Sequence, residues 1–258
     1  MSEYRHSNSV LTPTAYNASD NTDTSFPATN VGTYSWPNRI YKSSTVDLAD
    51  WVGVDLGSAK AVTDVVVDNV NVSIIKIQAS STSIGDVTPD YTTGVLSVAQ
   101  NPVEGKMRYI LRDISETYRY WWVLCQSIAT YPTGGVFSVG SFTCLSATTT
   151  WSQSPERVEI QKKSVIRPQS IGGGGKPVGV GNRYAHLRIP PGVMLPGMRA
   201  TLNEVLGYGE DTTFLMDFND GTTYNWYWVN RIGDTEIKVP GSNMIEISPG
   251  MLLKTVVD

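Results

Sequence analysis

The sequence predicts an all-β fold, with an N-terminal jelly-roll β-sandwich followed by a smaller, mostly β domain that contains one short helix. Short β-branched and aromatic segments alternate with turn residues along the chain, which has 23 Gly and 14 Pro among 258 residues. Charged residues make up 17% of the chain and aromatic residues 10%, whereas average soluble chains carry about 25% charged residues. Helical periodicity occurs in one segment only. These observations argue against a coiled coil, a helix bundle and a disordered tail.

Residues 8–147 carry the strand signals of the expected jelly roll. The segments alternate or are rich in β-branched and aromatic side chains, and Gly, Asn, Asp or Ser residues separate them. The expected strands are Trp51–Leu56, Val62–Val67, Ser73–Ala79, Tyr109–Arg112, Tyr120–Cys125 and Val136–Leu145. Six or more short strands with regular turns are typical of a sandwich or jelly roll.

Residues 148–258 form the expected second domain, after a polar linker at Ser146–Thr150. Strands are expected at Arg157–Gln161, Ala185–Ile189, Thr213–Phe218 and Tyr224–Asn230, the last two joined by an Asn219-Asp-Gly221 hairpin turn. The helix is expected at Met198–Leu206, where apolar residues recur at helical spacing between Pro196 and Gly207. Residues 1–7 are expected to form a polar arm, and the glycine-rich segment 169–182 a flexible one that becomes ordered against a neighbouring subunit.

The N-terminal segment resembles the discoidin-like, or galactose-binding-like, jelly rolls. The resemblance covers about half the chain and rests on the order of several motifs. These are Phe26-Pro-Ala-Thr-Asn30, Trp51-Val-Gly-Val-Asp-Leu-Gly57, Val62–Val67, Ile75-Lys-Ile-Gln-Ala-Ser80, and the two Arg-Tyr strands Arg108–Arg112 and Arg119–Trp122. The first two motifs look like versions found in bacteriophage tail and fibre proteins.

The second segment is similar to the small β domains of phage distal tail and baseplate proteins, in the order of its helix, Gly209, Thr213–Phe218 and the aromatic strand. Distal tail proteins more often place the ring-forming domain first, whereas here the discoidin-like part comes first. The resemblance implies a structural virion protein of a phage tail tip or baseplate, made in the host cytoplasm and located in the virion tail. It would assemble as a homo-oligomeric ring, a hexamer by resemblance, and contact other tail or baseplate proteins.

The alternative is a carbohydrate-binding module for host-surface recognition. Sugars stack on aromatic rings while planar polar groups fix their hydroxyls. Trp36, Asn38 and Arg39 offer such groups in an expected loop before a strand, and discoidin-like domains usually meet ligands at such loops. The competing interpretation is that Trp36 fills the bottom of the barrel and that Arg39 pairs locally.

The sequence predicts no enzyme, metal site or cofactor. The chain has two His and two Cys, and it lacks the Gly-x-Ser-x-Gly motif of serine hydrolases. Gly172–Lys176 looks like a phosphate loop, but Pro177 follows where Ser or Thr and a helix are needed. Cys125 and Cys144 lie in apolar segments and are expected to be buried free thiols. The net charge of −4 argues against a nucleic-acid partner, and the longest apolar segments are too short for a membrane span.

Overall fold

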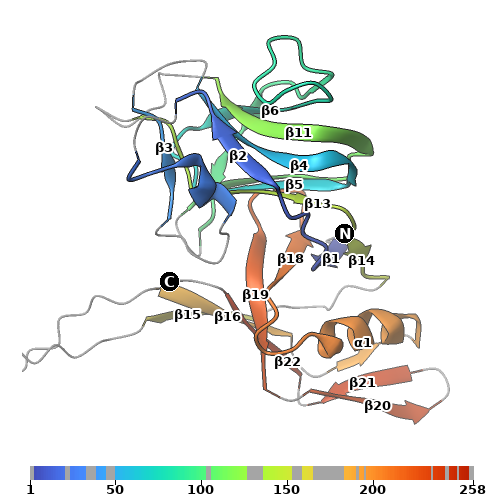
Figure 1. Ribbon diagram of the computed structural model, residues 1–258. Coiled ribbons are helices and arrows are strands. Elements are labelled where there is room, and N and C mark those ends of the chain that lie inside the picture. Colours follow the sequence, from blue (N-terminus) through green and yellow to red (C-terminus); the bar gives the residue numbers. More distant parts are fainter. Residues whose placement is uncertain are drawn as a thin grey trace, which may run out of the picture. The chain divides into compact units, whose positions relative to one another are not determined.

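The chain folds into two compact units (Figure 1). The computed structural model describes residues 3–20, 24–32, 39–44, 50–102, 106–126, 136–152, 159–164, 183–189, 192–194, 196–233, 235–241, 244–248 and 250–255. One unit, called here the jelly-roll unit, contains residues Ser7–Thr148 and Asn219–Trp226. The other, called the second unit, contains Met1–His6, Thr149–Phe218 and Tyr227–Asp258. Strands dominate both, and the one α-helix of the described residues is α1, Arg199–Gly207, so the expected fold class is confirmed.

Two antiparallel sheets build the jelly-roll unit. A four-stranded sheet has the order β13 (Ser141–Leu145), β5 (Asp64–Asp68), β10 (Met107–Leu111) and β9 (Ala99–Gln100). The larger sheet has the order β2 (Ala15–Ala18), β4 (Trp51–Val62), β11 (Glu116–Cys125), β6 (Ile74–Ser80) and β7 (Tyr91–Thr92), with β8 (Leu96–Ser97) also on β6. A 3-10 helix, η1 (Ala28–Gly32), and the short pair β3 (Tyr41–Lys42) and β12 (Ser138–Val139) complete the unit.

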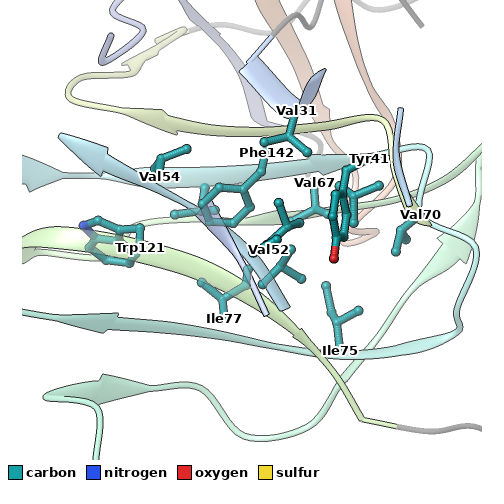
Figure 2. Packing of buried hydrophobic residues seen from close by; sticks show 14 of the residues in the cluster. Val31, Tyr41, Val52, Val54, Val67, Val70, Ile75, Ile77, Trp121 and Phe142 are labelled. Atoms are coloured by element: carbon teal, nitrogen blue, oxygen red, sulfur yellow. The ribbon is translucent and has the colours of Figure 1, made fainter. Parts of the chain in front are cut away.

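The core of the jelly-roll unit lies between these sheets (Figure 2). Val52 and Val54 of β4, Ile75 and Ile77 of β6, and Phe142 of β13 are all buried. Their spacing of two residues places one face of each strand toward the core. Complete burial of each such aliphatic or aromatic side chain contributes about 1.5–3 kcal/mol, so the alternation read in the sequence is the main source of stability here.

Residues 219–226 belong to the jelly-roll unit although they lie in the segment expected to form the second domain. Their turn is closed by Asp220, whose Oδ1 accepts a hydrogen bond from the Thr222 backbone N–H at 3.0 Å. Gly221 adopts a φ of 92°, a backbone conformation that residues other than glycine rarely adopt. The segment lies along β10, because the Ile110 N–H donates to the Thr223 carbonyl at 2.9 Å.

A buried arginine holds this segment. Arg108 of β10 is 1% exposed, and its Nε and Nη2 lie 3.2 and 3.1 Å from Oδ1 of Asp68 on the neighbouring strand β5. Its Nη1 donates to the Trp226 carbonyl at 2.7 Å, and the guanidinium lies 4.4 Å from the centroid of the Trp226 ring. One buried charge therefore joins two strands and the sequence-distant turn.

Replacing Arg108 by Met should lower the free energy of unfolding by about 3–5 kcal/mol, because the buried Asp68 carboxylate loses its partner. Urea unfolding measures this loss. The double variant Arg108→Met/Asp68→Asn should recover part of it, and Arg112→Met, at a half-buried position, should cost less. A loss under about 1 kcal/mol for Arg108→Met, the value of a surface pair, would contradict this role.

The second unit contains two sheets and α1. The larger has the order β14 (Thr149–Thr150), β1 (Glu3–Ser7), β18 (Phe214–Asn219), β19 (Trp226–Ile232), β22 (Met251–Thr255), β16 (Arg183–Ile189) and β15 (Glu159–Ser164). The smaller has the order β17 (Gly192–Met194), β21 (Met244–Ser248) and β20 (Glu236–Gly241). The expected helix and hairpin are present, with Leu202 and Val205 of α1 buried. The segment expected as an N-terminal arm instead supplies β1, and segment 169–182 lies outside the described residues.

His6 of β1 is fully buried in the second unit. The Trp151 indole N–H donates to His6 Nδ1 at 2.9 Å, so the neutral ring carries its proton on Nε2. Nε2 lies 3.4 Å from Glu204 Oε1 of α1, and the Tyr208 hydroxyl donates to the same oxygen at 3.0 Å. Burial lowers the pKa of His6, and the Glu204 carboxylate opposes that shift in part.

The second unit should lose stability as the pH falls below about 6.5, the pKa of an unfolded histidine. The pKa of His6 is lower in the folded chain, so the unfolded chain binds the proton first and stability is complete above that pH. The loss is at most about 1.4 kcal/mol per pH unit. Thermal melts between pH 7 and 5 measure it. His6→Asn should abolish this dependence, whereas His186→Asn, at a partly exposed position, should keep it; an unchanged pH dependence in His6→Asn refutes the assignment.

Candidate functional site

The structure places one of the three sequence-predicted site residues. Trp36 and Asn38 lie outside the described residues, whereas Arg39 is described and exposed, shortly before β3. The structure therefore does not bring the three side chains together, and the site formed by Trp36, Asn38 and Arg39 stays a prediction.

The residues with catalytic chemistry lie in packed surroundings. Cys125 and Cys144 are buried free thiols, as expected, and burial raises the pKa of the Cys144 thiol. His6 contacts Trp151, Glu204 and Tyr208, so it does not face a serine, threonine or cysteine that it could activate. Within the part of the chain that the structure describes, no group of three His, Cys, Asp or Glu side chains is arranged to hold a metal ion, and no helix is long and apolar enough to span a membrane.

Three half-buried tyrosines gather in the jelly-roll unit. We call Tyr91, Tyr109 and Tyr118 the tyrosine cluster; they come from β7, β10 and β11, and therefore from both sheets. The rings of Tyr91 and Tyr118 have centroids 6.5 Å apart. Both also contact the buried Trp121 ring, at 5.7 Å and 6.1 Å. All three tyrosines pack against the core while part of each side chain remains exposed.

A register shift between β4 and β11 places Tyr118 and Trp121 on the same face. Tyr118 lies opposite Lys60, whereas Tyr120 lies opposite Asp55, so the pairing breaks around Arg119. Strict alternation would put residues three apart on opposite faces. Between these two pairs β11 advances by two residues and β4 by five, so the pairing is irregular here. Tyr118 and Trp121 both contact the core.

Arg119 and Tyr120 lie away from the core cluster as a result of the same shift. The Arg119 guanidinium donates to both carboxylate oxygens of Asp55, from Nε at 2.7 Å and from Nη2 at 2.8 Å. Its Cζ lies 4.8 Å from the Tyr120 ring centroid. The ion pair with Arg119 lowers the pKa of Asp55. Arg119 is thus engaged on the opposite side of β11 from the tyrosine cluster.

The hydroxyls of the tyrosine cluster stay protonated at neutral pH. Burial raises the pKa of Tyr91, and the Glu116 carboxylate and the nearby Tyr109 raise it further. Desolvation raises the pKa of Tyr118, as do the charges of Glu116 and Asp90, and its hydroxyl hydrogen-bonds to Glu116. The pKa of Tyr109 is raised by burial as well. The cluster therefore offers aromatic faces and neutral hydroxyls, which suit binding better than nucleophilic chemistry.

A cleft of about 460 Å³ lies in the second unit and is lined by Glu210, Asp211, Asn230, Arg231, Ile232, Lys254 and Thr255. Its polar side chains already hold the local loops in place. Asn230 Nδ2 donates to the Glu210 carbonyl at 2.9 Å, and Arg231 Nη1 donates to the Gly233 carbonyl at 2.6 Å. Because these side chains already hydrogen-bond to the backbone, the cleft is a weaker candidate for a ligand site than the tyrosine cluster.

Sequence reasoning placed Tyr109 in an expected strand, but it left Tyr91 outside the expected strands and did not bring the three tyrosines together. Strict alternation predicts that Tyr118, Tyr120 and Trp122 share one face of the strand. The sequence signal for a break in this alternation is the Asp55-Leu-Gly57 turn on the neighbouring strand. Gly57 there has a φ of 77°, and its N–H donates to Asp55 Oδ1 at 2.7 Å. This local turn interrupts β4 opposite Arg119.

Comparison with known proteins finds no matching family model and no matching curated protein. Among solved structures, the chain is similar to chitosan-binding module 1 of a chitosanase/glucanase from Paenibacillus sp. IK-5 (20% identity, 52% of this chain and 96% of that one, TM-score 0.38). It is also similar to the Streptococcus pneumoniae fucose binding module SpX-3 (11%, 55% and 98%, 0.42). A third is the family 32 module of C. perfringens NanJ in complex with galactose (14%, 52% and 93%, 0.39).

The matches span little more than half of this chain, and at these identities and TM-scores they carry no conclusion about what this chain binds or does. The phage-tail role implied by the sequence resemblance is not supported by them and stays a prediction, as does the absence of enzyme activity.

Proposed function

We propose that the jelly-roll unit is a carbohydrate-binding module and that the tyrosine cluster is its ligand site. The observation that carries the proposal is a group of three partly exposed tyrosines from three strands, all packed against the core, of which Tyr91 and Tyr118 contact each other and the buried Trp121. A sugar presents apolar ring faces and hydroxyls, and a tyrosine presents an apolar ring and a hydroxyl. The tyrosine ring can stack on the apolar face of the sugar, and the tyrosine hydroxyl can hydrogen-bond to a sugar hydroxyl.

Rigidity supports this role. Tyr91 and Tyr118 are held by ring contacts with Trp121, which is fully buried. Side chains already fixed by packing lose little rotamer freedom when a ligand arrives, which preserves more of the contact energy as affinity. Their raised pKa values keep both hydroxyls protonated at neutral and mildly alkaline pH.

Removing a ring from the cluster should weaken glycan binding on the order of tenfold or more, because an aromatic contact contributes about 0.5–1.5 kcal/mol beyond the area it buries. Screening the full chain on a glycan array and titrating each ligand by calorimetry against Tyr91→Ala and Tyr118→Ala tests this. The matched control is Tyr120→Ala, since Tyr120 is also partly exposed but lies away from the core cluster.

The same titration separates the two proposed sites. Loss of binding in Tyr91→Ala and Tyr118→Ala supports the tyrosine cluster. Loss only in Trp36→Ala and Arg39→Ala would move the site to the loop predicted from the sequence. A chain that binds no glycan on the array is not a carbohydrate-binding module of the kind proposed.

The second candidate is the assembly role, with the chain as a ring-forming subunit of a phage tail tip or baseplate. It is favoured by β15, which ends the order of the seven-stranded sheet and pairs with β16 over six residues. An edge strand can pair with a strand of another chain, and Ile160 within it is 40% exposed.

Assembly should appear as a solution mass several times the 28.2 kDa of one chain. Native mass spectrometry or light scattering at micromolar concentration measures it. Ile160→Lys, which adds a charge to the edge strand, should shift the population toward the monomer. A wild-type chain that remains monomeric would leave glycan recognition as the sole function proposed.

A further inference from the structure

Two carboxylates flank the tyrosine cluster. Asp90 immediately precedes Tyr91, and Glu116 lies two residues before Tyr118 at the start of β11. Asp90 Oδ2 accepts a hydrogen bond from the Ser81 N–H at 2.7 Å, and Glu116 accepts one from the Tyr118 hydroxyl. An ionised carboxylate has about four acceptor positions, so each retains capacity for a ligand.

Neither carboxylate is neutralised by a cation in the part of the chain that the structure describes. The half-buried Arg119, the cation nearest in sequence to Glu116, is already paired through two hydrogen bonds with Asp55. Arg112 acts on the Tyr109 hydroxyl, and its Nη1 donates to the Thr222 carbonyl at 2.8 Å. Glu116 raises the pKa of both Tyr91 and Tyr118, and Asp90 raises that of Tyr118. Lys60 lies opposite Tyr118 in the β4–β11 pairing and is exposed.

This combination suits a positively charged ligand group. The face of an aromatic ring attracts a cation within about 6 Å of its centroid. A carboxylate beside the ring adds a charge-assisted hydrogen bond, which is roughly twice as strong as a neutral one. An anionic sugar would be repelled by the two carboxylates. A neutral sugar would gain no attraction between opposite charges from them.

We infer that the tyrosine cluster selects a glycan with a free ammonium group, as in a deacetylated amino sugar, which Glu116 and Asp90 recognise against the tyrosine faces. The inference rests on the proposed carbohydrate-binding function. It narrows the ligand class by charge: ammonium-bearing sugars first, neutral sugars next, and uronic or sialic acids last.

The test compares two ligands that share one sugar backbone and differ in whether the nitrogen is a free amine or is acetylated and neutral. The full chain is titrated by calorimetry with the β-1,4-linked tetramer of glucosamine and with the tetramer of N-acetylglucosamine, at a pH where the free amine is protonated. We expect the glucosamine tetramer to bind on the order of tenfold more tightly, as for a hydrogen bond to a charged group. Raising the pH until the amine is neutral should remove this preference.

Variants assign the preference to the two carboxylates. Glu116→Gln and Asp90→Asn should each bring the affinity ratio of the two tetramers toward one, while binding of the acetylated tetramer continues and shows that the fold is intact. Asp211→Asn is the matched control, because it removes the same charge from an exposed position in the second unit. It should leave the ratio unchanged, which excludes a general attraction of a cation to a chain of net charge −4.

The outcomes separate the inference from the function on which it rests. Equal affinities, or tighter binding of the acetylated tetramer, would overturn the inference while leaving carbohydrate binding in place. A preference that survives both carboxylate variants, or that Asp211→Asn also removes, overturns it as well. If neither tetramer binds and the glycan array is also empty, the proposed function itself fails.

Discussion

A register shift between β4 and β11 marks the point where the side chains of β11 that face the core change their alternation. Tyr118 and Trp121 are three residues apart and would lie on opposite faces of a regular strand. Because the pairing breaks around Arg119, both contact the core, and Arg119 lies on the other side, where it meets Asp55. The aromatic cluster and the Asp55–Arg119 ion pair are therefore two consequences of one local irregularity. Such irregularities are over-represented beside binding and active sites because they redirect side chains.

A buried charge provides the second organising constraint, because it joins parts of the chain that the sequence keeps far apart. Arg108 is inaccessible to solvent and must satisfy its donors internally. It does so with Asp68 on the adjacent strand and with the backbone of Trp226, 118 positions later. The turn 219–226 is consequently part of the jelly-roll unit, and the boundary between the units does not follow a single point in the sequence. Neighbouring bonds from Asn101 to Tyr224 and from Arg112 to Thr222 reinforce this arrangement.

Local features of the sequence predicted much of the fold. Alternation in Trp51–Leu56 and the aromatic run at Tyr120–Cys125 identified β4 and β11, and the apolar spacing from Met198 to Leu206 identified α1, because each pattern reflects contacts within one element. The Asn219-Asp-Gly221 turn was identified through the backbone conformation that glycine permits. Long-range pairing left no such signal. The polar residues of β1 gave no indication that His6 packs against Trp151, and nothing local indicated that Arg108 meets Trp226.

The candidate site was less predictable than the fold for the same physical reason. The sequence predicted a strand at Tyr109 but none at Tyr91, and the grouping of the three tyrosines depends on packing between two sheets. The charges on Glu116 and Asp90 are ordinary in sequence. The structure shows that Arg119 hydrogen-bonds to Asp55 and Arg112 to the Thr222 carbonyl, so these two arginines already have other partners. What distinguishes the tyrosine cluster from a packed sheet edge is therefore its unbalanced charge beside accessible rings. Asp90 accepts a hydrogen bond from the Ser81 N–H and Glu116 one from the Tyr118 hydroxyl, and neither is in an ion pair among the described residues.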